Sequence, residues 1–242
     1  MGKQKKQKED CNLNTRQRIY QTAKRLYLEN GYDSTPNTMI AKEAGVNLGL
    51  VTYYFKTKDI IASDMLNNNY EVLFSHVLKY LDREDELLQL VTFFSLHFKI
   101  TGIDPDYDRF IYEMNKLDLL EKATRDGNLY KLYESIIEKN DCLHPEEKKR
   151  RHDYALTASY GVMRALTLKQ YEGELVLSKE ELFEICISEM FYALKIEANP
   201  LLQKSLLNSA DNITDRILDE YQMLKSVKNY LFQDIPPTVC EQ

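Results

Sequence analysis

Hydroxyl and ammonium groups are concentrated in one short segment, residues 47–58, which reads NLGLVTYYFKTK. Thr52, Tyr53 and Tyr54 supply three hydroxyls in succession, and Lys56 and Lys58 follow with two cationic groups. Such groups meet the phosphate oxygens and the base edges of DNA. The residue types therefore indicate contact with nucleic acid, and no other part of the chain carries so specific a pattern.

Two helical patterns precede this segment and are expected to hold it in place. Residues 15–30 carry apolar side chains at i, i+4, i+7 and i+8, which is typical of an amphipathic helix. Asn14 can cap the start of this helix, and Gly31 can take the left-handed conformation after its end. A second helix is expected from Thr35-Pro36, because proline has no N–H to leave unpaired in a first turn.

A glycine turn leads from the second helix to the segment that carries the hydroxyls. Gly45 allows a positive φ that a side chain would resist, and Asn47 can cap a third helix over residues 48–55. So short a helix does not fold alone. It must pack on the first two helices through Val51, Phe55 and either Leu48 or Leu50. Its other face then presents Thr52, Tyr53 and Tyr54.

With this spacing the chain resembles the TetR/AcrR family of repressors over roughly residues 14–62. The resemblance implies an all-α fold, with an N-terminal three-helix helix-turn-helix domain that binds DNA and a larger helical-bundle domain that binds a ligand and dimerises. The alternative, a buried helical hairpin with no nucleic-acid role, does not account for the whole pattern. The matching positions are Ile19, Ala23, Leu26, Tyr27, Gly31, Tyr32, Thr35, Ile40, Ala41, Ala44, Gly45, Val46, Gly49, Tyr54, Phe55, Lys58 and Asp59.

The resemblance also assigns roles to single positions. Asn47 stands where the family usually has a serine that caps the recognition helix, and Tyr54 and Lys58 stand where the family contacts phosphate. Thr52 replaces a DNA-contacting tyrosine, and its neighbour Tyr53 can supply the lost contact. Further departures from the pattern are Pro36, Asn37, Leu48 and Leu50, so the operator sequence cannot be transferred from a relative. The predicted DNA-binding residues are Thr35, Asn47, Leu48, Gly49, Leu50, Thr52, Tyr53, Tyr54, Lys56 and Lys58.

Charge is distributed unevenly along the 242 residues. The net charge is −6, but residues 1–58 hold 11 Lys and Arg against 5 Asp and Glu, a charge of +6, and the remainder carries −12. A basic head on an acidic body orients a molecule on DNA through its head. Residues 1–11 are expected to be a disordered basic tail; the alternative is an arm that follows the phosphate backbone or enters the minor groove.

Other classes of protein are disfavoured. No Walker loop, G-x-S-x-G, H-E-x-x-H or dinucleotide motif is present, so neither an enzyme nor a cofactor is expected. The four cysteines form no C-x-x-C pair, which favours reduced thiols in the cytoplasm. Cys142 and His144 have no second pair of ligands nearby, so a surface loop without metal is expected. The sequence shows no signal peptide, and its longest uncharged run, residues 87–98, is too short to span a bilayer. The cysteines are Cys11, Cys142, Cys186 and Cys240.

Beyond the head the pattern remains helical, because Gly and Pro are few and no run alternates as a strand does. A helix from Lys58 to Tyr80 is expected to join head to body. Others are expected at residues 84–101, 107–120, 129–140, 144–173, 182–198 and 200–224, with a capping box at Ser178 and Glu181. The predicted domains are the tail (1–11), the helix-turn-helix domain (12–57), the ligand-binding and dimerisation domain (58–232) and a loose C-terminal tail (233–242).

The last helices are the candidates for forming a homodimer, as the resemblance implies, and the pair that does so stays open. The central helices are rich in aromatic residues, which can enclose a cavity with polar tips for a hydrophobic or aromatic ligand. For any one of them, ordinary core packing is the alternative, and it is the resemblance that implies a pocket. The candidate ligand-binding residues are Phe94, His97, Phe98, Phe110, Met114, Tyr133, Tyr154 and Met163.

Two functions are compatible with these observations. The first is a transcriptional repressor that binds a palindromic operator as a homodimer and is released by a small hydrophobic or aromatic ligand. The second is a DNA-binding architectural or adaptor protein whose body binds a protein partner. An enclosed cavity between the central helices would favour the first function, and a solid core would favour the second.

Overall fold

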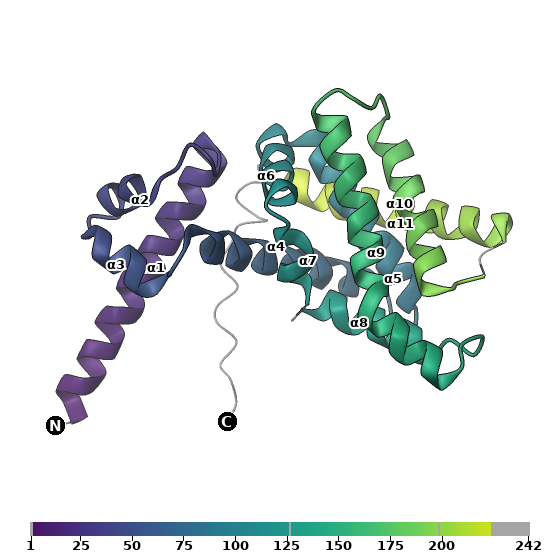
Figure 1. Ribbon diagram of the computed structural model, residues 1–242, viewed down its shortest axis with the longest axis horizontal. Helices are drawn as coiled ribbons and strands as arrows, with labels where there is room; N and C mark the ends of the chain where they lie inside the picture. Colours follow the sequence, from purple (N-terminus) through teal and green to yellow (C-terminus); the bar gives the residue numbers. More distant parts are fainter. Residues whose placement is uncertain (1, 126, 198, 224–242) are drawn as a thin grey trace.

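The computed structural model describes residues 2–125, 127–197 and 199–223, and within these ranges the regular structure is entirely helical (Figure 1). A small head and a larger body lie at opposite ends of one connecting helix. The all-α prediction is therefore confirmed. None of the helices in the described ranges combines the length and apolarity needed to cross a membrane.

The head consists of α1 (Gly2–Asn30), α2 (Asn37–Glu43) and α3 (Leu48–Tyr54). Its core is formed by side chains that are at most 1% exposed, because each helix turns its apolar stripe inward. These side chains are Ile19, Ala23, Tyr27, Ile40, Val51 and Phe55.

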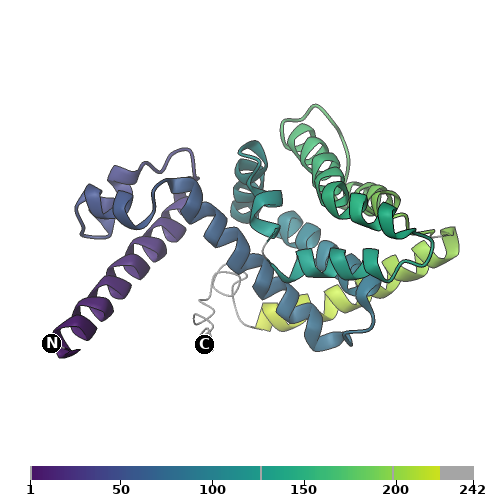
Figure 2. The same ribbon diagram turned by 60° about the horizontal axis from the view of Figure 1, so that its bottom comes forward.

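The first helix begins earlier than the sequence predicted. Residues 2–11 are not a disordered tail but the first turns of α1, which project beyond the rest of the head (Figures 1 and 2). Lys, Gln and Glu favour helix, and neither Gly nor Pro interrupts residues 3–30. The helix therefore runs through Asn14, which does not cap it.

The connecting helix α4 (Lys58–Tyr80) has the predicted bounds. The body continues with α5 (Glu86–Ile103), α6 (Pro105–Lys116), α7 (Leu119–Thr124), α8 (Asn128–Glu138), α9 (Pro145–Tyr171), α10 (Lys179–Leu194) and α11 (Pro200–Met223). Helix α5 lies at the centre and packs against α4, α6, α8, α10 and α11, which explains why it is apolar on nearly all sides.

One predicted body helix is divided in two. The Asp104 carboxylate accepts hydrogen bonds from the backbone N–H groups of Asp106 (3.0 Å) and Tyr107 (3.1 Å) and so caps α6. The chain then reverses at Asp118, whose φ is +56°, before α7 begins. The apolar pattern continues through Leu119 and Leu120, so periodicity alone did not signal this break.

The two C-terminal helices follow the prediction more closely. The capping box at Ser178 and Glu181 is present at the start of α10. Helix α11 lies along α5, where the hydroxyls of Thr214 and Ser95 form a buried hydrogen bond of 3.1 Å. The predicted loose tail, residues 233–242, lies outside the described residues.

Candidate nucleic-acid interface

The third helix presents one face to the head and the other to solvent. Val51 and the residue after its end, Phe55, are 0% and 1% exposed and anchor the helix on the core. Tyr54 is half-buried beside them, with its ring 5.1 Å from that of Tyr53. The side facing solvent is formed by Leu48, Gly49, Leu50, Thr52 and Tyr53. The structure therefore brings these five predicted contact residues together on one surface. The expectation that Leu48 or Leu50 helps to anchor the helix is wrong, because both leucines are exposed.

A glycine positions this surface, as the sequence predicted. Gly45 has φ +62°, and the N–H of Val46 donates to the carbonyl of Ala41 (3.0 Å), which closes the turn between α2 and α3. Asn47 occupies the N-cap position of α3, but its side chain makes no capping hydrogen bond and is exposed. Its amide group is therefore left facing solvent beside the third helix.

Thr35 does not belong to this surface. Its side chain is fully buried, and its hydroxyl donates to the carbonyl oxygen of Gly31 at 2.7 Å. The turn after α1 folds inward, so this hydroxyl closes the turn and is not available to DNA. Helix α2 accordingly starts at Asn37, with Pro36 in the N-cap position, one residue later than expected.

The two predicted lysines differ in their surroundings. Lys56 is exposed just after α3. Lys58 is half-buried: its ammonium group donates to the carbonyl of Tyr32 at 2.9 Å and lies 3.9 Å from the centre of the Tyr32 ring. Lys58 therefore has a structural role in the head whether or not it also contacts phosphate.

Two cationic residues beside α3 were missed by the sequence analysis. Arg18 of α1 and Lys42 of α2 are exposed and line a recess of about 370 Å³ together with Asn47 and Leu50. Both are placed to contact phosphates that flank a base-contacting helix. The basic composition of the head indicated such contacts, but only the packing of α1 against α2 assigns them to these residues.

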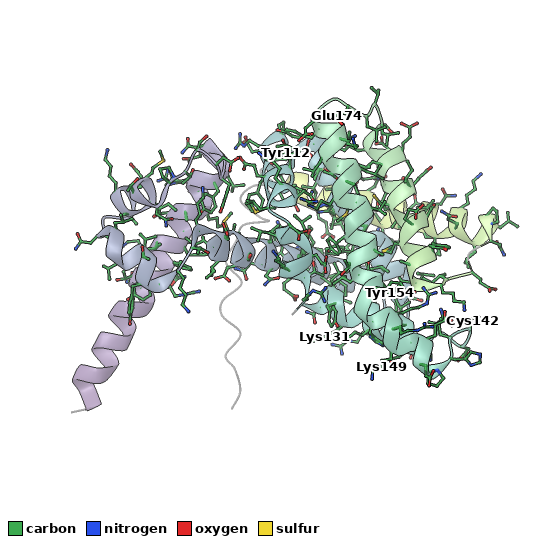
Figure 3. The ribbon with its side chains drawn as sticks, in the orientation of Figure 1. Tyr112, Lys131, Cys142, Lys149, Tyr154 and Glu174 are labelled. Carbon is green, nitrogen blue, oxygen red and sulfur yellow. The ribbon has the colours of Figure 1, made fainter. Side chains whose placement is uncertain are left out.

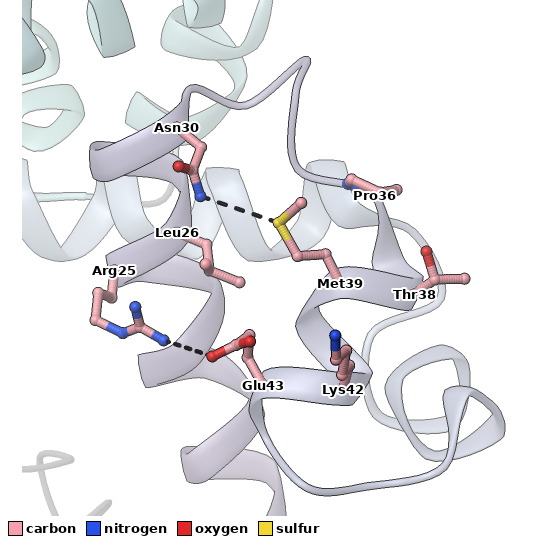
Figure 4. A pocket seen from close by; sticks show the side chains of 8 residues that line it. All are labelled: Arg25, Leu26, Asn30, Pro36, Thr38, Met39, Lys42 and Glu43. Atoms are coloured by element: carbon pink, nitrogen blue, oxygen red, sulfur yellow. Dashed lines mark hydrogen bonds and ion pairs between the residues drawn. The ribbon is translucent and has the colours of Figure 1, made fainter.

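A larger recess on the head, of about 570 Å³, is not part of this surface (Figure 4). It lies between α1 and α2, where Arg25 forms an ion pair with Glu43 at 3.5 Å. Asn30 donates to the sulfur of Met39 across the same gap at 3.9 Å. The recess is lined by no residue of α3, and these contacts hold α2 on α1.

The Lys56→Ala variant is expected to bind every DNA sequence more weakly and to have a flatter salt dependence. Removing one phosphate contact should reduce the slope of log K against log salt concentration by roughly 0.9. Its melting temperature should not change, since Lys56 is exposed. The measurement is fluorescence anisotropy between about 50 and 200 mM salt. Lys131→Ala and Lys149→Ala, both on the body (Figure 3), are the matched controls. An unchanged slope would exclude Lys56 from the interface.

The head is fastened to the body by hydrogen bonds at the end of α1. The N–H of Tyr32 donates to the Glu113 carboxylate of α6 at 2.8 Å, and the Arg109 guanidinium donates to the carbonyl of Leu28. Gly31 has φ +88°, and a Cβ there would lie 2.8 Å from a Glu113 oxygen. The Tyr32 hydroxyl also donates to Asp59, at the start of α4. Both α4 and α6 therefore fix the orientation of the head.

The body core contains a small cavity between the central helices. Its volume is only about 10 Å³, room for about one water molecule, and it lies between α5, α8, α9 and α10. Three predicted ligand-binding residues, Phe94, Tyr133 and Met163, line it. The other predicted residues that are buried in the core but do not line this cavity are His97, Phe98, Phe110 and Met114.

Tyr154 does not lie in the core at all. Its side chain is 44% exposed on the outer side of α9 (Figure 3), where the Arg151 guanidinium lies 5.6 Å from its ring centre. The expected position between the central helices is not observed, because α9 begins with solvated turns at residues 145–152. An aromatic residue that follows such turns gives no sign in the sequence of which way it faces.

A chain of buried hydroxyls connects the cavity to the connecting helix. Tyr160 lines the cavity, lies 2.9 Å from the Thr124 hydroxyl and shares a hydrogen bond with Tyr70 of α4. Nearby, the Tyr107 hydroxyl donates to Asn69 of α4 at 2.9 Å. Burial raises the pKa of Tyr70, Tyr107 and Tyr160, so these groups remain protonated donors.

His97 should make stability depend on pH. Burial, and to a smaller extent Lys179, lowers the pKa of His97 to about 3. Below pH 6.5 the unfolded chain binds a proton that the folded chain does not, so stability falls as pH falls toward 3. Between pH 6.5 and 5 this amounts to at most about 2 kcal/mol. Chemical denaturation measures the free energy of unfolding. Over this pH range it should decrease less in His97→Gln than in the wild type. In His144→Gln, which alters an exposed histidine, it should decrease as much as in the wild type. Equal decreases in all three proteins would contradict the assignment.

Cys142 is exposed in the loop between α8 and α9 (Figure 3), and burial raises the pKa of Cys186 to about 12. Within the described ranges, no three His, Cys, Asp or Glu side chains gather as ligands.

An exposed helix after a glycine turn, held on a small basic head, defines a helix-turn-helix DNA-binding protein. Comparison with known proteins agrees: residues 19–65 match the model of the bacterial regulatory proteins of the tetR family. Over 67 residues the chain is 34% identical to the uncharacterized HTH-type transcriptional regulator YuxN of Bacillus subtilis (strain 168). That match covers 28% of this chain but only 23% of YuxN.

The similarity of fold extends over the body. The chain resembles the crystal structure of Thermus thermophilus FadR, a TetR-family transcriptional repressor in complex with lauroyl-CoA, with a TM-score of 0.56 and 18% identity. The alignment covers 76% of this chain and 97% of FadR. Residues 19–65 therefore match the tetR family of bacterial regulatory proteins, and the fold of the chain is similar to that of one TetR-family repressor.

Proposed function

We propose that the protein is a transcriptional repressor that binds a palindromic operator as a homodimer and leaves it when a small hydrophobic or aromatic ligand binds. The observation that carries the DNA-binding part is the solvent-facing surface of α3, anchored by Val51 and Phe55 and flanked by exposed Arg18, Lys42 and Lys56. One helix of this length reads only a few base pairs, so two copies are needed for a specific site.

The distribution of charge supports the same orientation on DNA. The head and the start of α4 carry +6, whereas the rest of the chain carries −12. DNA phosphates attract the positively charged head and repel the negatively charged body. The molecule would therefore approach DNA with its head, and the acidic body would be kept away from the duplex.

The outer side of α9 and α10 is the proposed dimer interface. These helices pack side by side at the end of the body far from the head (Figures 1 and 2). On α9 the exposed positions follow helical spacing and include small residues, which allow close helix contact: Tyr154, Ala158, Gly161 and Ala165. On α10, Tyr192 is 83% exposed, and a recess of about 580 Å³ separates it from Tyr154. A second copy would bury this apolar surface by two-fold symmetry.

The test of DNA reading compares specific with non-specific affinity. Tyr53→Ala should lower affinity for the operator by about 5- to 150-fold, equivalent to about 1–3 kcal/mol, and leave affinity for random duplex nearly unchanged. Lys56→Ala serves as the contrasting variant, since loss of a phosphate contact weakens both. Equal losses on the two DNAs for Tyr53→Ala would mean that its side chain contacts only the backbone.

Ligand release is proposed to act through the connection between the core and α4. The cavity has a volume of only about 10 Å³, so a ligand must displace side chains. The flexible Met163 and Met190 that line it are suited to this movement. An occupant that reaches Tyr160 would disturb its hydrogen bond to Tyr70 and so shift α4. The lauroyl-CoA in FadR supports a ligand in this fold, and a coupling of about 1–3 kcal/mol would change operator affinity about 5- to 150-fold.

The second candidate is an architectural or adaptor protein whose body binds a protein partner. The small size of the cavity between α5, α8, α9 and α10 favours it. Thermal unfolding in the presence of a panel of hydrophobic compounds distinguishes the two. Stabilisation by a compound that also weakens the operator complex supports ligand release, and a compound that stabilises without affecting DNA affinity argues against the coupling.

A further inference from the structure

The solvent-facing surface of α3 lacks the groups that usually read guanine. Helix α3 has the sequence LGLVTYY and contains no charged residue and no amide side chain. Guanine is most often recognised by Arg or Lys, which donate two hydrogen bonds to its O6 and N7. Cations close to α3 lie beside it and not on it: Lys56 and Lys58 follow its end, Arg16 and Arg18 belong to α1, and Lys42 belongs to α2.

The two leucines on this surface are not needed for the core of the head. Leu48 is 45% exposed and Leu50 is 37% exposed. Half-buried apolar residues such as Val46 and Tyr54 pack against the core, whereas both leucines are exposed. An apolar side chain in a DNA-contacting helix has one partner in the major groove, the C5 methyl group of thymine.

Gly49 lets the bases come close to the helix. It lies between the two leucines, and a Cβ at this position would meet no atom within 4 Å. A glycine inside a helix costs about 1 kcal/mol relative to alanine, so packing within the head does not explain it. On the same surface, the Tyr53 hydroxyl can donate to thymine O4 or adenine N7. The Thr52 hydroxyl donates to the carbonyl of Leu48 at 3.4 Å and can still accept from adenine N6.

We propose that α3 reads A·T base pairs, with Leu48 and Leu50 in contact with thymine methyl groups, and that the half-sites contain no guanine recognised through its N7 by this helix. This inference rests on the proposed function, since it requires that α3 enters the major groove. It goes further because it names the bases that the operator must contain.

The experiment replaces single atoms of the DNA. A duplex selected from a random pool is resynthesised with deoxyuridine in place of one thymidine at a time, which removes only the methyl group. Affinity should fall about 3- to 5-fold at each thymine that a leucine contacts, as expected for burial of one methyl group. Replacing a half-site guanine by 7-deazaguanine, which lacks the N7 acceptor, should change affinity less than twofold.

The Leu50→Ala variant assigns the contact to its residue. At one position of each half-site, this variant should bind duplexes with thymidine and with deoxyuridine equally tightly. At the other thymines, deoxyuridine should weaken its binding as much as it weakens binding by the wild type. Leu201→Ala, which shortens an 81% exposed leucine of α11, should behave as wild type. Because Leu50 is exposed, the variant should fold normally, and its melting temperature checks this.

The outcomes separate this inference from the function on which it rests. Specific binding that ignores deoxyuridine, or that falls tenfold or more with 7-deazaguanine, would overturn the thymine assignment and leave the DNA-binding function standing. The absence of any sequence-specific complex would overturn both.

Discussion

An Ala158→Arg variant is expected to be a monomer and to lose about 10²- to 10⁴-fold in affinity for the operator. Ala158 is exposed on α9 in the proposed dimer interface, where helices must approach closely. A long charged side chain there would be buried without a partner, so the two-fold contact should not form. Two linked heads gain about this factor over one head, because the second half-site is bound at a high effective concentration.

Sedimentation measures the oligomeric state and anisotropy measures DNA affinity for the same preparation. Ser205→Arg adds the same side chain to an exposed position of α11, away from the interface, and should remain a dimer with wild-type affinity. If Ala158→Arg stayed dimeric, the interface would have to lie elsewhere on the body.

A Gly31→Ala variant is expected to unfold at a temperature about 6–12 °C lower than the wild type. A side chain at φ +88° costs about 1–2 kcal/mol. The added Cβ would also displace Glu113, and loss of its hydrogen bond with the buried N–H of Tyr32 costs about 1–3 kcal/mol. For a chain of this size, about 3 kcal/mol corresponds to that shift.

Gly173→Ala is the matched control. Gly173 has φ +77°, but a Cβ there would meet nothing within 4 Å, so only the backbone strain is added. Calorimetry should therefore show that Gly173→Ala lowers the unfolding temperature clearly less than Gly31→Ala does. Equal shifts would mean that Glu113 moves aside freely and does not fix the head on α6. Operator affinity should fall in Gly31→Ala alone, because only this change loosens the head.

The head was the most predictable part of the chain because its signals are local. The turn at Gly45, the buried Val51 and Phe55 and the bounds of α4 all follow from spacing within a few residues. The inward position of Thr35 could not be read this way. Its hydroxyl is placed by the path of the chain between α1 and α2, which no periodic pattern describes.

In the body, the sequence predicted the helices better than it predicted their contacts. The capping box at Ser178 is a local signal and was found, whereas the reversal at Asp118 interrupts a continuous apolar pattern. Tyr133 and Tyr154 look alike in sequence, but the first lines the interior cavity and the second lies on the surface. Arg18 and Lys42 likewise become neighbours of α3 only through packing.

The central claim, that two heads read a palindromic operator, is tested most directly by selecting bound duplexes from a random pool and counting the protein chains on each by native mass spectrometry. The account predicts enrichment of palindromic sites whose half-sites are centred about one helical turn apart, ~34–36 Å, or a multiple of it, in an A·T-rich context, with chains bound in pairs. Selection that enriches no sequence, or enriched sites without two-fold symmetry that bind a single chain, would contradict it.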